Sequence, residues 1–345
     1  MTLAPEPQPL GVDELRRKAL ERIAPMAAFP QPLMESLGLA AAEDVRADVD
    51  LPRFDNAAVD GYAVRHQDIA DAPVSLPVVG EIGAGQSRMI ALAPKTAARI
   101  TAGAPIPTGA DTVVPVAWTD RGAGQVRVER APEAQANVRR AGSNIAQGDL
   151  VVRTGTTLGV RELAVLASVG RASVVTRPRP RVVVIATGSE LREPGQPLAH
   201  DSVYDANSYL VAATVRSTGA VAFRAGVVPD DAHLFRTTLD DQLVRADIVV
   251  TTGGTSSYDV VRSELSGRGI WFGDVNVPGV ERAVAHGFGL VGDSSQTAAD
   301  EQYVPHVPIF ALPGDPALVA ASLEAFVLPV LDKMMGRASA VGTEF

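Results

Sequence analysis

The sequence predicts an α/β protein, a doubly wound and mainly parallel sheet preceded by a helical N-terminal segment and a β-rich middle. From residue 181 onward, strand-like runs alternate with helical runs over roughly 150 residues, which is typical of a parallel sheet. These strand-like runs are almost wholly apolar, as in strands buried on both faces. Between residues 49 and 181, short β-branched runs broken by Gly and Pro replace this alternation. We therefore expect two different architectures in one chain.

The alternating half follows a stiff junction at residues 177–180, Arg-Pro-Arg-Pro. We expect a helix that Asp205 caps and Gly219 ends, and another that Pro229 and Asp230 begin. The last helix places Val319, Leu323, Phe326 and Val330 on one face. The segment 292–306 has no periodicity and is expected to form a surface excursion. The expected strands are 181–188, 220–228, 247–252 and 307–312, and the expected helices before the last are 205–219, 229–246 and 258–265.

The first half begins with an expected helix at 13–23, because Leu15, Ala19 and Ile23 have helical spacing and Asp13 is placed to cap them. Two further helices are expected at 32–42 and 160–168. The expected strands lie within 74–80, 111–118, 124–130 and 149–155.

Composition excludes several classes of function. The 345 residues carry a formal net charge of -9 with no basic cluster, which disfavours nucleic acid and anionic membranes as partners. The absence of cysteine excludes disulfides and thiolate sites and suits a cytoplasmic protein. We find no long apolar span and no signal pattern, and the five histidines are scattered without metal-ligand spacing.

Three loops that follow expected strands are the candidate binding residues. In a doubly wound sheet such loops share one edge, where ligands commonly bind, and backbone N–H groups there suit anions. Each loop alone is also explained as a tight turn. No GxGxxG motif follows the first strand of the alternating half, and no GxxxxGK[ST] motif is present anywhere, which weighs against dinucleotide and P-loop sites. The candidates are Thr187, Gly188 and Ser189; Gly253, Gly254, Thr255, Ser256 and Ser257; and Pro313, Gly314, Asp315 and Pro316.

A second polar patch is PRFDNAAVDGYAVR, residues 52–65. Asp55, Asn56 and Asp60 flank a Gly-Tyr turn, and carboxylates suit magnesium. An Asx-rich turn without a metal explains the same residues.

Eight blocks in a fixed order resemble the molybdenum insertases, the molybdopterin molybdenumtransferases of the MoeA and gephyrin E-domain family. The resemblance covers residues from about 10 to 335. The blocks are PRFDNAAVDGYAVR, ARITAGAPIPTGADTVVPV, VRRAGSNIAQGDLVVRTGT, LGVRELAVLASVG, RVVVIATGSEL, SVYDANSYLVAA, DIVVTTGG and ALPGDP.

The resemblance implies a homodimer with a discontinuous N-terminal domain (1–50 and 147–178), an inserted β-rich domain (51–146), a MogA-like molybdopterin-binding α/β domain (179–336) and a tail (337–345). It implies three of the family's four domains, because only GRASAVGTEF follows the last expected helix.

The family reaction inserts molybdate into adenylylated molybdopterin with Mg²⁺ and releases AMP. Carried over, Asp60, Glu190 and Asp259 are the implied catalytic residues, and Asp60 and Asp259 the implied metal ligands. Pro313 and Pro316 match prolines of the family motif.

Several family positions are substituted. Ala102 stands where the family has a threonine, Ser143 and Asn144 replace two carboxylates, and Val277 and Val280 replace two lysines. The loop after Gly253-Gly254 is shorter than the family's, and Asp315 replaces an amide. Two lost cations and one gained anion oppose anion binding by about 1 to 3 kcal/mol each if partly buried.

Two functions remain open. One is an insertase that binds molybdopterin and molybdate and meets other cofactor-biosynthesis proteins. The other is a catalytically degenerate relative that serves as a pterin-binding, scaffold or regulatory module.

Overall fold

The computed structural model describes residues 9–85, 90–277, 280–291 and 306–337. The chain divides into two compact units. The seven-stranded unit consists of the described residues of Met1–Glu43, Thr154–Gly159 and Ser173–Phe345, and the five-stranded unit consists of those of Asp44–Arg153 and Val160–Ala172. The surface excursion expected at 292–306 lies outside the described residues except for His306.

The sheet of the seven-stranded unit has the order β1-β18-β19-β20-β17-β13-β16. The four strands at one side, β20, β17, β13 and β16, are parallel, whereas β19 is antiparallel to both of its neighbours. The sheet is therefore mainly parallel with one reversed strand. The bounds are β1 (Leu10–Gly11), β13 (Arg181–Thr187), β16 (Val221–Val228), β17 (Ile248–Thr252), β18 (Trp271–Asn276), β19 (Val284–Val291) and β20 (Val307–Leu312).

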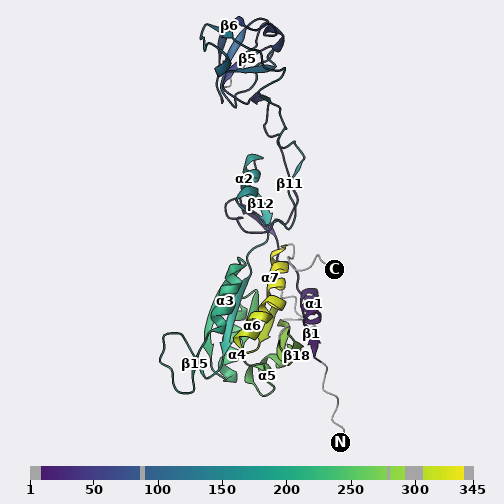
Figure 1. Ribbon diagram of the computed structural model, residues 1–345. Helices are drawn as coiled ribbons and strands as arrows, with labels where there is room; N and C mark the ends of the chain where they lie inside the picture. The colour runs from purple at the N-terminus through teal and green to yellow at the C-terminus, as the bar shows by residue number, and fades with distance from the viewer. Residues whose placement is uncertain (1–8, 86–89, 278–279, 292–305, 338–345) are drawn as a thin grey trace. The chain divides into compact units, whose positions relative to one another are not determined.

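Helices cover both faces of this sheet, which confirms the doubly wound prediction (Figure 1). Val182 and Val184 point into a core with α1, α3, α6 and α7, while Val183 and Ile185 point into a core with α4 and α5. The alternation explains why β13 is wholly apolar between its ends. The bounds are α1 (Val12–Arg22), α3 (Asn207–Ser217), α4 (Ala232–Leu243), α5 (Val260–Gly267), α6 (Pro316–Ser322) and α7 (Leu328–Met335).

The last helical segment behaves as its spacing predicts. Val319, Leu323, Phe326 and Val330 are all fully buried against the sheet. Between α6 and α7 the helix widens into a π-helical turn, η4 (Leu323–Val327).

Several local predictions were wrong. Residues 32–42 form no helix: Pro30 and Pro32 lie in β2 (Phe29–Pro32), which pairs with β12 (Ser173–Thr176), and Gly38 follows a turn with a positive φ of 78°. Asp13 does not cap α1, because Gly11 occupies the cap position and Asp13 pairs with Arg16 instead. Helix α4 begins at Ala232 with Asp231 as its cap, later than the expected start at Pro229 and Asp230.

The five-stranded unit contains a sheet of order β8-β5-β7-β6-β9. Both faces are covered, since Ala63 and its neighbour Tyr62 lie in two separate apolar clusters. Helix α2 is found where it was predicted. The expected strand at 111–118 ends at Pro115, and a 3₁₀ turn, η2 (Val116–Trp118), follows it.

The remaining bounds are β5 (Gly61–Val64), β6 (Val74–Ile82), β7 (Ala97–Ile100), β8 (Thr112–Pro115), β9 (Gln125–Val128) and α2 (Val160–Ser168). Short pairs are β3 (Val45–Arg46) with β11 (Leu150–Val152), β4 (Asn56–Ala57) with β10 (Val138–Arg139), and, in the seven-stranded unit, β14 (Leu191–Arg192) with β15 (Val203–Tyr204). A further 3₁₀ turn is η1 (His66–Asp68).

Candidate functional site

The three predicted loops begin at one edge of the seven-stranded sheet. Ala186 on β13 pairs with Thr252 on β17, and Thr252 pairs with Leu312 on β20. All three strands are parallel, so their carboxyl ends lie side by side. The loops at 188–190, 253–259 and 313–316 therefore start from adjacent positions, as the strand pattern predicts.

Close backbone packing explains the two glycines of the middle loop. Gly253 has φ 85° and donates its N–H to the carbonyl of Leu312 at 3.0 Å. A Cβ on Gly253 would lie 2.5 Å from the carbonyl oxygen of Thr187, and one on Gly254 would lie 2.5 Å from Cβ of Val261. Only glycine fits both positions, because the contacts involve backbone and a β-branched carbon.

The rest of the middle loop presents hydroxyls above the start of α5. Ser256 and Ser257 are exposed, and their hydroxyls have no hydrogen-bond partner among the described residues, whereas Thr255 is buried. Asp259 caps α5 by accepting the N–H of Val261 on Oδ1 at 3.0 Å, which leaves its other oxygen without a hydrogen bond in the described structure. The loop therefore offers two hydroxyls and one carboxylate oxygen to a ligand.

Arg262 stabilises this loop from within. Its guanidinium donates to the carbonyl of Thr255 at 3.1 Å and lies 5.2 Å from the centre of the Phe272 ring. We expect Arg262 to contribute to loop shape rather than to bind an anion directly.

The first loop is closed by a reciprocal pair that the sequence did not predict. The N–H of Ser189 donates to Oδ2 of Asp230 at 3.0 Å, and the N–H of Asp230 donates to Oγ of Ser189 at 3.0 Å. Asp230 follows β16, which is parallel to β13, with Thr187 paired to Val228. The missed signal is therefore the carboxyl end of this fourth parallel strand, where the sequence pattern predicts only that Asp230 begins a helix.

Glu190 is exposed beside this pair. Its carboxylate accepts no hydrogen bond from the described residues and folds over Gly188, where a Cβ would lie 2.6 Å from Oε2. Glu190 is thus an available carboxylate at the same edge as Asp259.

The third loop begins α6. Asp315 accepts the N–H groups of Ala317 and Leu318 on Oδ1 at 2.9 and 3.1 Å, and Pro316 is the first residue of the helix. The N-terminal end of a helix favours a negative charge, so the dipole of α6 partly offsets the charge of the Asp315 carboxylate. Asn207, the first residue of α3, donates its side-chain N–H to the carbonyl of Gly314 at 2.7 Å.

The predicted residue Asp60 belongs to the five-stranded unit, whereas the other candidates belong to the seven-stranded unit. It is exposed and accepts the N–H of Ala102 on Oδ1 at 2.7 Å. Ala102, the residue that replaces the family threonine, thus binds Asp60 through its backbone N–H, which any residue except proline can supply.

The two neighbours of Asp60 in the patch at 52–65 have structural partners or are buried. Asp55 accepts the N–H of Ala141 at 2.8 Å and pairs with Arg140, and these two interactions hold the pKa of Asp55 below its usual value. Asn56 is buried in β4. Within the described ranges, no three Asp, Glu or His side chains gather as a metal-ligand cluster. Asp55 is therefore held by partners distant in sequence rather than by an Asx turn of its own.

The substituted lysine position Val277 is buried, with 3% of its surface exposed. Val280 is half-buried and donates its N–H to the carbonyl of Val277 at 3.1 Å. Neither residue supplies a charge to the edge of the sheet.

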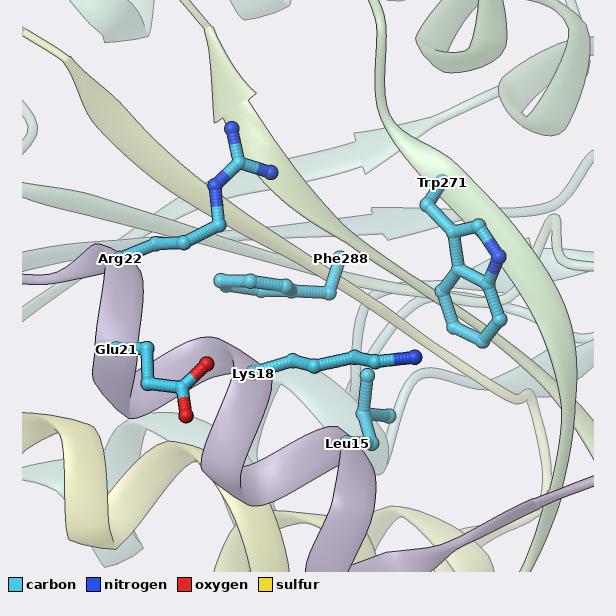
Figure 2. Close-up of a pocket in the computed structure, with 6 residues that line it drawn as sticks. All are labelled: Leu15, Lys18, Glu21, Arg22, Trp271 and Phe288. Atoms are coloured by element: carbon cyan, nitrogen blue, oxygen red, sulfur yellow. The ribbon is translucent and has the colours of Figure 1, made fainter.

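Two hollows of the seven-stranded unit differ in chemistry. One, of about 340 Å³, touches the middle loop through Ser257, Tyr258 and Asp259, and Ser263 and Glu264 of α5 line it as well. The other, of about 200 Å³, lies between α1 and the strands β18 and β19. Figure 2 shows the ring of Phe288 between the side chains of Arg22 and Trp271, and none of the predicted site residues lines this hollow. Of the two, only the hollow at the middle loop is part of the candidate site.

None of the helices among the described residues is both long and apolar enough to cross a membrane.

Comparison with known proteins gives a consistent result over almost the whole chain. Residues 10–170 match the family described as "MoeA N-terminal region (domain I and II)", and residues 183–333 match the "Probable molybdopterin binding domain". Molybdopterin molybdenumtransferase 2 of Mycobacterium tuberculosis H37Rv is 38% identical over 333 residues, covering 94% of this chain and 80% of the relative. Molybdopterin molybdenumtransferase of Nostoc sp. is 35% identical over 308 residues, covering 87% and 68%.

Solved structures agree. Two crystal structures of a molybdopterin biosynthesis MoeA protein from Pyrococcus horikoshii match with TM-scores of 0.81 and 0.75. Both are 27% identical in sequence, and they cover 97% and 96% of this chain and 82% and 81% of their own chains.

Proposed function

We propose a specific reaction for this chain, which belongs to the MoeA family of molybdopterin molybdenumtransferases and serves molybdenum-cofactor biosynthesis. The protein would bind adenylylated molybdopterin and insert molybdate in a Mg²⁺-dependent reaction that releases AMP. The observation that carries the proposal is the meeting of three polar loops at the carboxyl ends of β13, β17 and β20. That edge is where α/β sheets bind anionic ligands.

The chain offers suitable groups for each part of the substrate. Ser256 and Ser257 would donate hydrogen bonds to a phosphate, since their hydroxyls are exposed and unpaired in the described structure. Backbone at Gly253 and Gly254 can approach a ligand closely because neither residue has a side chain. Glu190 would orient a substrate group or accept a proton from it, because its carboxylate is exposed and accepts no hydrogen bond within the described ranges.

The donor set is compatible with Mg²⁺. Asp259 and Asp60 each use one carboxylate oxygen for a backbone N–H and keep the other without a hydrogen bond in the described structure. Mg²⁺ is usually held by one or two carboxylates together with substrate phosphates, so a larger cluster is not required. Asp259 and Asp60 would hold the ion, which when bound would neutralise phosphate charge and aid departure of AMP.

The resemblance to the family implies a homodimer, and we propose that this chain forms one. The five-stranded unit would act as the inserted domain, which carries Asp60. We propose the domain bounds that the resemblance implies: residues 51–146 for the inserted domain and residues 179–336 for the molybdopterin-binding domain. Sedimentation equilibrium that shows a monomer at micromolar concentration would contradict the homodimer.

The decisive experiment is a turnover assay. The purified protein is incubated anaerobically with adenylylated molybdopterin, molybdate and Mg²⁺, and AMP is measured by chromatography. We expect AMP release that needs both molybdate and Mg²⁺ and is abolished by chelation. No release under conditions in which a Nostoc relative is active would contradict the proposal.

A second function is favoured by one observation, the burial of Val277 at a family lysine position. A relative without that cation could bind molybdopterin and act as a scaffold or regulator. The same assay separates the two, because this alternative predicts saturable molybdopterin binding by titration without AMP release.

A further inference from the structure

Arg224 lies at the centre of a polar cluster that the proposed reaction does not use. We call Glu193, Asp205, Ser208, Tyr209 and Arg224 the Arg224 cluster. The guanidinium of Arg224 donates to Oγ of Ser208 at 2.6 Å, to both carboxylate oxygens of Glu193 at 2.7 and 2.9 Å, and to Oδ2 of Asp205 at 3.2 Å. It also lies over the Tyr209 ring, 3.6 Å from its centre.

The cluster is more deeply buried than an ordinary surface ion pair. Asp205 is 1% exposed and Ser208 is fully buried. Asp205 accepts the N–H of Ser208 at 3.0 Å as well as its hydroxyl, and Tyr209 donates to Glu193 at 3.2 Å. A buried carboxylate needs such partners, because removing it from water is costly.

The cluster connects segments that carry two of the three site loops. Glu193 lies in the segment 188–206, which also carries Glu190. Two backbone hydrogen bonds close this segment: the Val203 N–H donates to the Glu190 carbonyl at 3.0 Å, and the Asp205 N–H donates to the Arg192 carbonyl at 2.9 Å. Asp205 and Ser208 flank Asn207, whose side chain donates to the Gly314 carbonyl. Arg224, on the edge strand β16, therefore contacts both segments at once.

We propose that Arg224 is a positioning residue. It holds the segment 188–206, which carries Glu190, at the edge of the sheet, and it fixes Asn207 where its side chain binds the Gly314 carbonyl. Both loops are then held in the conformation that binds the substrate. The inference rests on the proposed function for its substrate, but its structural part does not. Preorganised loops reduce the ordering cost of binding, so the effect falls on affinity.

Glu193 allows this role to be separated from folding. It is one-third exposed, and α3 is held separately by the buried side chains of Val211 and Val215. Removing Glu193 leaves Asp205 paired with Arg224 and Ser208, so Glu193→Ala releases the segment without leaving a buried charge unpaired.

The first test is hydrogen exchange of the protein without ligand. In Glu193→Ala we expect the Val203 and Asp205 amides to exchange about tenfold faster, with Glu193→Gln intermediate because it keeps one acceptor. The matched control is Arg181→Gln, which removes a comparable Arg–Asp pair at the opposite end of β13 and should leave these amides unchanged. Unchanged exchange in Glu193→Ala would overturn the proposal.

The second test measures anaerobic titration with molybdopterin and the kinetics of AMP release. We expect Glu193→Ala and Arg224→Lys to raise Kd and KM about tenfold while kcat changes less than about threefold. Equal losses in kcat and kcat/KM, or unchanged Kd and KM, would overturn the positioning role. If the unmodified protein binds no molybdopterin, the proposed function fails, and the exchange experiment still decides the role of Arg224.

Discussion

Polar residues lie near both ends of β13, and the fold uses them differently at the two ends. At the amino end, Arg181 and Asp247 form a bidentate pair at 3.0 and 2.9 Å, and the Arg181 N–H adds a third bond at 2.7 Å. At the carboxyl end, the Glu190 carboxylate accepts no hydrogen bond from the described residues, and Ser256 on the adjacent loop is exposed. Residue type alone therefore does not show which polar groups the fold uses and which remain for a ligand, because only their hydrogen-bond partners distinguish them.

The site edge also contains groups that the fold has already used. Ser189 and Asp230 satisfy each other, and Asp315 caps α6. A list of polar residues at the edge therefore overestimates the number available to the substrate. Four changes, in order of expected effect, test this distinction.

The largest effect is expected from Gly253→Ala at the site edge. The new Cβ would lie 2.5 Å from the Thr187 carbonyl in a backbone with positive φ, so we expect a loss of roughly 3 kcal/mol in the free energy of unfolding. The matched control is Gly269→Ala, which has φ 83° but nothing within 4 Å of its Cβ, and should cost about 1 kcal/mol. Urea denaturation measures both, and equal losses would show that the close approach is unimportant.

Asp259→Asn separates capping from charge. Asparagine caps helices as well as aspartate does, so we expect a stability change below about 0.5 kcal/mol. Loss of the carboxylate should lower AMP release about 100-fold, because a charged group proposed to hold Mg²⁺ is removed. Unfolding curves and turnover are compared on the same preparation, and unchanged turnover would remove Asp259 from the site.

His286 tests the interior, where a polar group is satisfied by the fold alone. It is 1% exposed, with Nδ1 2.8 Å from the Val284 carbonyl and Nε2 2.7 Å from Oγ of Ser322. Burial lowers the pKa of His286 below 6.5, and the bond to Val284 opposes that shift only in part.

The unfolded chain therefore takes up a proton near pH 6.5 while the folded protein does not. The contribution of His286 is complete above that pH and is lost as the pH falls toward the lower folded pKa, at up to about 1.4 kcal/mol per pH unit. Between pH 8 and pH 5, the free energy of unfolding should fall more steeply for the unmodified protein than for His286→Asn. Parallel curves would contradict the assignment.

The smallest effect is expected at the amino end of β13. Arg181 is half exposed, so its pair with Asp247 is screened by solvent, and Arg181→Gln should cost less than about 1 kcal/mol. Turnover should not change, since no candidate loop touches Arg181. A marked loss of activity would break the comparison between the two ends.

Much of the fold was predictable from periodicity. The apolar strands β13, β17 and β20, the helices between them and the buried face of Val319, Leu323, Phe326 and Val330 follow from local patterns that burial reinforces. The false helix at 32–42 shows the limit, because apolar spacing there competes with prolines paired in β2. The reversed strand β19 was also missed, since the direction of a strand is decided by its neighbours.

The candidate site divides in the same way. The sequence by itself determined which residue types gather at the carboxyl ends of the parallel strands, and its ordered blocks determined the family, because both depend on local spacing. Only the tertiary structure decided which polar groups near this edge already have a partner within the fold: Ser189 is bound to Asp230, and Glu193 is bound to Arg224. The physical reason is that hydrogen bonds between residues distant in sequence depend on folding geometry, and satisfied groups give up their capacity to bind a ligand.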